Sequence, residues 1–366
     1  MGIFARSKAP ILTPADIDLS GIKGGNDAKV IGVCNAAVAD LRISGQGDKI
    51  ILFPRVIIEP IKEVTDPCGP VPFCYWCQGE LKIGHGMFLK PKRPEQSLVI
   101  DNDGKKHQRH TSFLAKVTCS HDFSRKEIEV AGLLPQTEDE VSGVEDGRAV
   151  WFEDKWHLAY TAVSPTHGIC VAHATTLDWQ TFDRRNIIFA DPNKDACLLP
   201  ERINGEIIWF HRPSGEHARP SIWLGFGQEP WRPSGPDLFV APRPGMSWEQ
   251  ERIGISGPPF RANGVAGEFI IPYHGRSKSH GTYGQGFIFA RFQNGERKIV
   301  AQSKKPALGM NLFRDVHKKG LVPRANFSCG QVVEPDGRCI VIVSRADTDL
   351  WLAETTIPQI LKHLEV

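Results

Sequence analysis

Two carboxylates and a guanidinium stand within four residues in the segment "GVEDGRAVWF", where Glu145, Asp146 and Arg148 precede a run of apolar residues. Neighbouring carboxylates raise each other's pKa and so favour a proton-donating carboxyl near neutral pH, whereas an adjacent arginine lowers the pKa. The sequence leaves the balance between the two effects open. The segment is therefore a candidate for proton transfer or for binding a polar ligand.

Other apolar segments carry polar side chains at corresponding places. Residues Asn35, Asp195 and Glu201 occupy the same place as the acidic pair, and the ends of the following segments add Arg55, His211, Arg212, His274, Arg345 and Asp347. If these segments are strands that converge, the polar groups meet in one funnel. Such a funnel suits a ligand with many hydroxyl groups better than a flat apolar ligand.

The apolar segments recur in a fixed order, five times each. The first kind covers 32–40, 143–151, 196–203, 256–264 and 328–335; the second covers 51–56, 157–164, 207–214, 269–276 and 340–348; the third covers 113–120, 170–177, 223–230, 288–295 and 351–358. Three strands repeated five times, with a variable fourth, predict an all-β five-bladed β-propeller whose first strands line a central channel. An irregular β-sandwich is the alternative.

The predicted propeller is a single domain over residues 1–366. Its first blade carries a cysteine- and aromatic-rich insertion at about 57–110, which has no counterpart in the other four repeats. Helical spacing is convincing only in "TTIPQILKHLEV", so the sequence predicts a short C-terminal helix.

Composition narrows the function classes. Lys and Arg number 44 against 42 Asp and Glu, and this near-balance argues against a nucleic-acid binder. The sequence shows neither an apolar run of membrane-spanning length nor a signal-peptide core, so neither a membrane partner nor export is expected. Nine scattered cysteines indicate mostly buried, reduced thiols, and hence a cytoplasmic location.

Several motifs, taken together and in order, resemble glycoside hydrolase family 130, which contains β-mannoside phosphorylases and β-1,2-mannosidases. The motifs are "GVEDGR", "YTAVS", "NKDACLLPERINGEIIWFHRPS", "ARPSIW", "RIGISGPP", "IPYHG" and "SRADT", and the resemblance as a whole covers roughly residue 8 to the end. Members of the family are five-bladed propellers, in agreement with the repeats.

The resemblance implies a reaction and a set of roles. Asp146 matches the aspartate that supplies a proton to the glycosidic oxygen, in many members through a sugar hydroxyl, with inversion at the anomeric carbon. In the phosphorylases, inorganic phosphate attacks the anomeric carbon and mannose 1-phosphate forms. Cationic side chains in matching motifs would bind the attacking phosphate. The phosphate-binding candidates are Lys194, Arg212, Arg219, Arg252 and His274, and the substrate-binding candidates are Asn35, Arg55, Glu145, Arg148, Asp195, His211 and Asp347.

Two alternatives to phosphorolysis remain. An inverting β-mannosidase would use water and need a second carboxylate about 6.5–9.5 Å from the first. Candidates for that carboxylate are Asp195, Glu201, Glu268 and Asp347. A non-catalytic carbohydrate-binding propeller is the third reading. The aglycone and the linkage position depend on loop shapes and stay open.

Two departures from the family pattern stand out. Gly147 occupies the place of the usual proline beside Asp146 and loosens the backbone there. The loop "SPTHG" at 164–168 replaces a stretch where phosphorylases often carry a basic residue, which weakens the case for phosphate binding.

The insertion raises two further alternatives. Cys74 and Cys77, with Cys68 and His85 nearby, could hold a structural zinc, although an aromatic-rich insertion packed on the rim is the favoured interpretation. If the insertion reaches over the funnel, the side chains of Phe73, Tyr75 and Trp76 could stack on a sugar. No cofactor is expected beyond phosphate as a co-substrate, and the partners are an oligosaccharide and possibly further copies of the chain.

Overall fold

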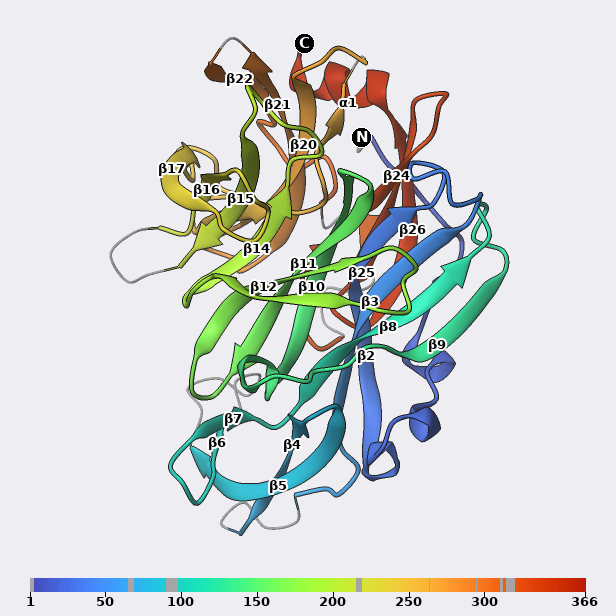
Figure 1. Ribbon diagram of the computed structural model, residues 1–366, viewed down its shortest axis with the longest axis vertical. Helices are drawn as coiled ribbons and strands as arrows, with labels where there is room; N and C mark the ends of the chain where they lie inside the picture. The colour runs from blue at the N-terminus through green and yellow to red at the C-terminus, as the bar shows by residue number, and fades with distance from the viewer. Residues whose placement is uncertain are drawn as a thin grey trace.

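The computed structural model describes residues 3–64, 69–89, 98–214, 219–262, 264–293, 295–309, 312–313 and 320–366. Throughout these ranges antiparallel β-sheets dominate, joined by short 3-10 turns and followed by one α-helix (Figure 1). The 3-10 turns are η1 (Pro14–Asp16), η2 (Leu19–Gly21), η3 (Gly25–Asp27) and η5 (Glu138–Glu140). The all-β prediction is confirmed at this level.

Five sheets hold most of the strands. The first contains β2 (Ala28–Asp40), β3 (Ile50–Pro60), β8 (Thr111–Cys119) and β9 (Lys126–Leu133). The second contains β10 (Gly143–Phe152), β11 (Lys155–Ser164), β12 (Gly168–Thr176) and β13 (Asp183–Phe189). The third contains β14 (Asn193–Leu198), β15 (Ile207–Pro213), β16 (Ile222–Gly227) and β17 (Ser234–Val240).

The fourth and fifth sheets have interrupted first strands. The fourth contains β18 (Arg252–Ile255), β20 (Glu268–Arg276), β21 (Tyr283–Gln293) and β22 (Glu296–Gln302), with β19 (Phe260–Arg261) also on β20. The fifth contains β25 (Arg338–Arg345), which pairs with β23 (Asn326–Phe327) and β24 (Gln331–Val333), followed by β26 (Asp349–Thr356) and β1 (Ala5–Arg6). Of the strand predicted at 256–264, residues 256–259 separate β18 from β19, because Pro258 and Pro259 lack the N–H that a continuous ladder needs. Only β19 is a strand within that range, and residue 263 lies outside the described residues.

Neighbouring sheets contact each other in chain order. Strand β2 contacts β10, β10 contacts β14, β14 contacts β18, β21 contacts β23, and β25 contacts β2. The apolar clusters follow the same order, with one between the first and second sheets, one shared by the second to fourth, one between the fourth and fifth, and one between the fifth and first. The core is therefore divided among the spaces between sheets.

The short helix predicted at the C-terminus is present as α1 (Ile357–Leu364). Thr356 caps it by accepting a hydrogen bond from the backbone N–H of Gln359, and Pro358 stands in its first turn. Ile360 and Leu364 are buried against the fourth and fifth sheets. No helix in the described part of the chain is both long and apolar enough to cross a membrane.

A sixth, smaller sheet lies between β3 and β8 in the chain. It contains β4 (Val71–Cys77), β5 (Glu80–Leu89), β6 (Leu98–Ile100) and β7 (Lys106–Gln108). Figure 1 shows it at the end of the molecule opposite α1. Two backbone hydrogen bonds attach β4 to the rest of the protein, from Cys74 N to Arg109 O at 3.0 Å and from Trp76 N to Val141 O at 2.8 Å.

Strand alternation decides two of the expectations about this insertion. Cys74 is buried and Cys77 is exposed, and because residues three apart on a strand face opposite sides, the two thiols cannot bind one zinc ion together. Cys68 lies outside the described residues, among which no cluster of potential ligands suited to a metal ion occurs. Trp76 is 2% exposed and packs edge-on against Phe113 in the core, so the expectation that it stacks on a sugar is wrong.

Candidate active site

Three first strands bulge at the same point and turn a polar side chain inward. Asn35 on β2, Asp146 on β10 and Asp195 on β14 have φ angles of 47°, 49° and 54°. Each lies where the register with the next strand slips by one residue. Bulges re-aim side chains, and Asn and Asp tolerate the left-handed region better than other residues with a Cβ. The segment with Glu145 and Asp146 therefore contains one of three equivalent β-bulges.

The bulged strands border a cavity of about 350 Å³. Nine of the predicted site residues line it, namely Asn35, Arg55, Asp146, Lys194, Asp195, Arg212, Arg252, His274 and Asp347. They come from all five large sheets or the turns beside them. The structure therefore brings together groups that lie more than 300 residues apart in the sequence.

Asp146 is held by neutral and cationic neighbours. Its Oδ1 accepts a hydrogen bond from Asn35 Nδ2 at 2.8 Å and lies 3.7 Å from Arg55 Nη1. Ser344 Oγ donates to Asn35 Oδ1 at 2.8 Å, which fixes the orientation of the amide. The Asp146 residue is 8% exposed and borders the cavity, so its carboxyl can reach a bound ligand without facing bulk solvent.

Glu145 points to two cations and does not line the cavity. Its Oε1 lies 2.6 Å from Arg55 Nη2, and its Oε2 lies 2.7 Å from Lys194 Nζ. Burial favours the protonated form, but Arg55 and Lys194 outweigh it and lower the pKa of Glu145 to about 2. The same ion pair raises the pKa of Lys194 against the effect of its burial. Glu145 is therefore a permanent carboxylate that positions two basic side chains.

Arg148 is a positioning residue. Its side chain is 1% exposed, and it donates to Asp146 O at 2.7 Å, to Ile255 O at 3.0 Å and to Ser256 O at 3.0 Å. It also pairs with Asp195 Oδ1 at 3.1 Å. These contacts join the second, third and fourth sheets beneath the cavity, so direct ligand binding by Arg148, as predicted from the sequence, does not fit its position.

Asp195 lies among basic groups of the third and fourth sheets. Its Oδ2 lies 2.8 Å from Arg212 Nη1 and 3.4 Å from His274 Nε2, although neither contact has normal hydrogen-bond geometry. Against its burial, Arg212 and Arg148 hold the pKa of this carboxyl well below its usual range. A Cβ at Gly254 would lie 2.3 Å from Asp195 Oδ2, so the close approach requires glycine there.

His274 is a neutral imidazole in this setting. Burial, reinforced by the charges of Arg212, Arg148 and Arg252, lowers its pKa to about 3, although Asp195 acts in the opposite direction. Its Nε2 lies 3.3 Å from Arg212 Nη1. His274 can therefore offer a polar contact to an anion, but the positive charge at this side of the cavity comes from Lys194, Arg212 and Arg252.

Asp347 is a carboxyl with a raised pKa. It follows β25 with a φ of 55° and lines the cavity. Burial raises its pKa to about 6, supported by the charges of Asp146 and Glu145 and opposed by Arg55 and Lys194. It can exchange a proton near neutral pH.

Four residues proposed from the sequence lie elsewhere. His211 is buried outside the cavity lining, stacks on Phe189 at 4.1 Å between ring centroids and contacts Asn193. Arg219 is exposed and does not line the cavity. Of the carboxylates considered for a hydrolytic base, Glu201 pairs with Arg261 and Glu268 pairs with Arg291, and neither lines the cavity.

The two departures from the family pattern have structural counterparts. An added Cβ at Gly147 would lie 3.1 Å from Leu158 Cδ1 and 3.3 Å from Ala37 Cβ, so the backbone beside Asp146 is closely packed. In the "SPTHG" turn, His167 Nδ1 lies 2.7 Å from Asp139 Oδ1 and lines a different cavity. Ile169, just beyond the turn, lines the site without adding charge.

The sequence reasoning missed the apolar side of the cavity. Its lining includes Ile169, Tyr283, Val322, Ala325 and Phe327. Tyr283 begins β21 within the stretch "HGTYGQG", whose glycines hide the strand in the sequence. Phe327 lies 4.6 Å from His274 between ring centroids, in a strand of two residues that no periodic pattern can reveal.

Comparisons with known proteins point to one family. The sequence model of glycoside hydrolase family 130, described as β-1,4-mannooligosaccharide phosphorylase, matches residues 105–366. A 1,2-β-oligomannan phosphorylase from Thermoanaerobacter sp. is 30% identical over 255 residues, which are 68% of this chain and 80% of that protein. A β-1,2-mannobiose phosphorylase from Listeria innocua is 27% identical and covers 100% of this chain and 99% of its own length.

The fold agrees with that result. A solved structure of Listeria innocua β-1,2-mannobiose phosphorylase, in complex with β-1,2-mannobiose, superposes with a TM-score of 0.83, at 23% identity and 99% coverage of both chains. The matched family region includes the second, third and fourth sheets, the fifth sheet except β1, and most of the cavity lining. The chain belongs to glycoside hydrolase family 130.

Proposed function

We propose that this protein cleaves β-mannosidic linkages in short oligosaccharides by phosphorolysis, with inversion, and releases mannose 1-phosphate. The observation that carries the proposal is one cavity lined both by Asp146 and by the cations Lys194, Arg212 and Arg252. A carboxyl can supply the proton and a cluster of cations can hold the attacking dianion. The phosphorylase names of the relatives support the same reaction.

The proposed reaction is a single displacement at the anomeric carbon. A phosphate oxygen attacks the anomeric carbon, the bond from that carbon to the glycosidic oxygen breaks, and a proton from Asp146, directly or through a sugar hydroxyl, goes to the leaving oxygen. Arg212 and Lys194 are each tied to a carboxylate by an ion pair, which restricts their motion before phosphate arrives. This preorganisation lowers the cost of binding an anion in the right place.

The linkage is part of the proposal. Two relatives are named for β-1,2-linked mannosides, whereas the family model is described by a β-1,4 activity. We infer a β-1,2 preference, because the β-1,2-mannobiose phosphorylase is similar over the full length of this chain.

The arrangement of the sheets is also inferred. We propose that the five large sheets are the blades of a single five-bladed β-propeller over residues 1–366, with the small sheet as an insertion in the first blade. The contacts between successive sheets and the return of the fifth sheet to the first support this arrangement. A cytoplasmic location, the absence of a cofactor and assembly into a homo-oligomer remain predictions from the sequence.

The test is sugar release from β-1,2- and β-1,4-linked mannobiose and longer oligomers, with and without inorganic phosphate. We expect mannose 1-phosphate of inverted, α configuration, detected by NMR, only when phosphate is present. Free mannose in both buffers would contradict phosphorolysis and favour hydrolysis. Asp347 would then be the base to test, because its carboxyl lines the cavity with a pKa near 6. No release in either buffer would favour a binding protein.

A further inference from the structure

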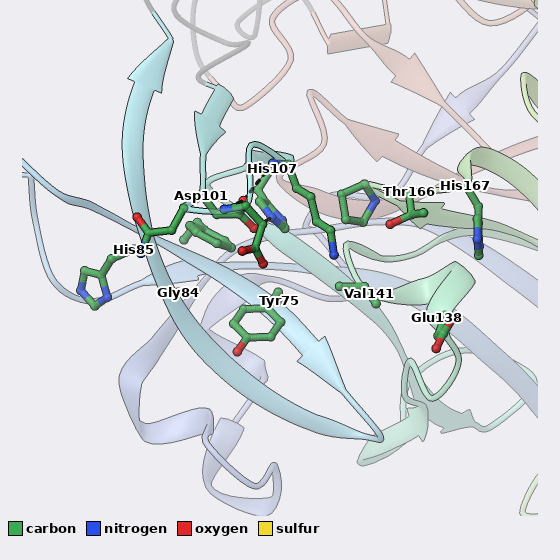
Figure 2. A pocket seen from close by; sticks show the side chains of 14 residues that line it. Tyr75, Gly84, His85, Asp101, His107, Glu138, Val141, Thr166 and His167 are labelled. Carbon is green, nitrogen blue, oxygen red and sulfur yellow. Dashed lines mark hydrogen bonds and ion pairs between the residues drawn. The ribbon is translucent and has the colours of Figure 1, made fainter.

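A second cavity is lined by residues that do not contribute to the candidate active site. Its volume is about 720 Å³, roughly twice that of the first. Residues of the small sheet and its β6–β7 turn form one wall, and Glu138, Val141 and the turn from Pro165 to His167 form the other. Figure 2 shows Tyr75, His85 and His107 on one side of this space and Thr166 and His167 on the other.

The small sheet presents an ordered aromatic surface to this cavity. The Phe73 ring stacks on His107 at 4.2 Å between centroids, and Tyr75 lies 5.9 Å from Phe73. His107 Nε2 lies 2.9 Å from Asp101 Oδ2, and the other oxygen of Asp101 accepts backbone hydrogen bonds from Asp103 and Lys105. These three rings, called here the aromatic platform, are therefore held in place by contacts within the protein before any ligand binds.

Gly84 makes this arrangement possible. A Cβ at that position would lie 2.4 Å from Phe73 Cζ, so the ring lies directly against the backbone of β5. His107 is 5% exposed and Phe73 is 3% exposed, whereas Tyr75 is half-buried and can be reached by a ligand. The accessible part of the platform is therefore the Tyr75 ring.

The charges of the second cavity differ from those of the first. Asp101, Asp103 and Glu138 line it together with Lys105 and the three histidines His85, His107 and His167. An acidic excess next to aromatic rings does not suit phosphate or another anion. Carboxylates and imidazoles can exchange hydrogen bonds with hydroxyl groups, and an aromatic face can pack on the C–H face of a sugar ring. The lining fits a neutral carbohydrate.

The linings of the two cavities come within two residues of each other along the chain. Pro165, Thr166 and His167 line the second cavity, and Ile169, two residues further on, lines the first. Two residues of extended chain span about 7 Å at most. On the other side, β4 is bonded to Val141, which lines the second cavity and lies four residues before Glu145. One flexible ligand can therefore pass from the first cavity over the turn into the second.

We propose that the second cavity binds the distal sugar units of an oligosaccharide whose terminal β-mannosidic bond lies in the first cavity. The proposal rests on the proposed function and adds a preference for longer chains. The small sheet would thus select chain length, while the bulged strands carry the reaction. The ligand class is a neutral β-linked manno-oligosaccharide of at least three or four units.

The experiment compares kcat/KM for a β-1,2-linked mannotetraose and for the disaccharide in the presence of phosphate, with the β-1,4-linked pair alongside. We expect Tyr75→Ala to lower the tetraose-to-disaccharide ratio of kcat/KM about threefold to tenfold, because an aromatic contact is lost. The disaccharide itself should be turned over as by the unaltered protein. Tyr75→Phe, which keeps the ring, should largely keep the ratio.

A second pair of variants compares the same Glu-to-Gln change inside and outside the second cavity. Glu138→Gln removes a carboxylate of the second cavity and should lower the ratio about twofold to fivefold, as expected for a lost hydrogen bond to a charged group at an exposed site. Glu63→Gln alters an exposed glutamate outside the lining of either cavity and should leave the ratio unchanged. An unchanged ratio in both Tyr75→Ala and Glu138→Gln overturns the proposal, as does an equal loss on both substrates.

Direct binding separates this inference from the proposed function. If the unaltered protein phosphorolyses no β-mannoside, the proposed function fails, and the imidazole NMR signals of His85 and His167 then decide the inference. Shifts on adding mannotetraose, absent in Tyr75→Ala, support it, and no shifts overturn it. Sedimentation completes the test: an oligomer that dissociates in Tyr75→Ala would show that another copy of the chain covers the cavity.

Discussion

The candidate active site and the second cavity are built in opposite ways. In the first, the charged groups are buried or half-buried and most of them are ion-paired, as in the pairs of Glu145 with Arg55 and Lys194. In the second, Lys105, Glu138 and His85 are exposed, and the ordered part is an aromatic platform. The first cavity lies where the first strands bulge, and the second lies where a separate sheet has been inserted.

This difference separates two tasks. A reaction that forms and moves charge needs groups whose positions and protonation states are fixed in advance, and buried ion pairs fix both. Recognition of a neutral chain needs surface area and a few hydrogen bonds, which exposed side chains can supply. We therefore expect changes in the first cavity to affect turnover and stability, and changes in the second to affect substrate choice.

The largest expected effect follows from Asp146→Asn. The amide keeps the shape of the side chain but cannot donate the acid proton, so kcat should fall about 10²- to 10⁴-fold. The fall should be equal for disaccharide and tetrasaccharide, and calorimetry should show that the oligosaccharide still binds. Asp336→Asn, an exposed substitution far from both cavities, is the matched control. Normal turnover by Asp146→Asn would remove this carboxyl from the reaction.

Next in size is the loss of stability in Arg148→Met. Because the substitution leaves the buried Asp195 with fewer partners and removes three contacts to backbone carbonyls, we expect the free energy of unfolding to fall by roughly 3 kcal/mol. Urea unfolding measures the change. Lys105→Met in the second cavity should change it by less than about 0.5 kcal/mol. Equal effects would contradict the distinction between the two cavities.

A smaller, pH-dependent effect is expected from Asp347→Asn. The native carboxyl has a pKa of about 6 and the ordinary value is 3.8, so the native state binds more protons between these values and ionisation costs stability as pH rises through this window. The variant should therefore be more stable than the unaltered protein at pH 8, by at most about 3 kcal/mol, and gain little at pH 4. Thermal unfolding at both pH values measures this, and a gain that is the same at both would refute the ionisation argument.

Much of the fold could be predicted because the second and third strands of each repeat are continuous and apolar. The ranges 157–164 and 170–177 fall within or nearly within β11 and β12. The first strand of each repeat is harder to predict from the sequence. Proline residues interrupt the fourth, and the bulges at Asn35, Asp146 and Asp195 shift the register by one residue, which no alternation pattern records.

The site could be predicted as a set of polar residues but not as a network. Nothing in the sequence indicates that Glu145 turns to Arg55 and Lys194, or that Arg148 lies beneath the cavity, because adjacent residues on a bulged strand need not alternate. The aromatic insertion was recognised, yet which of its rings faces a ligand depended on the strand position of β4. Alternation places Phe73 and Tyr75 on the face that lines the cavity and Trp76 on the opposite face, in the core.

The left-handed backbone at the three bulges also restricts how this scaffold can change its chemistry. Asn, Asp and Gly adopt this conformation at little cost, whereas most other residues pay about 1 kcal/mol or more. A lengthened carboxylate such as Asp146→Glu is therefore disfavoured by the main chain before its reach into the cavity matters. Substitution of Asn for Asp, or of Asp for Asn, remains possible at Asn35, Asp146 and Asp195. It changes the charge and the number of exchangeable protons of the side chain without changing its shape. The residues that these three positions can hold are therefore few, whereas the sequence of the inserted sheet is under no such backbone restriction.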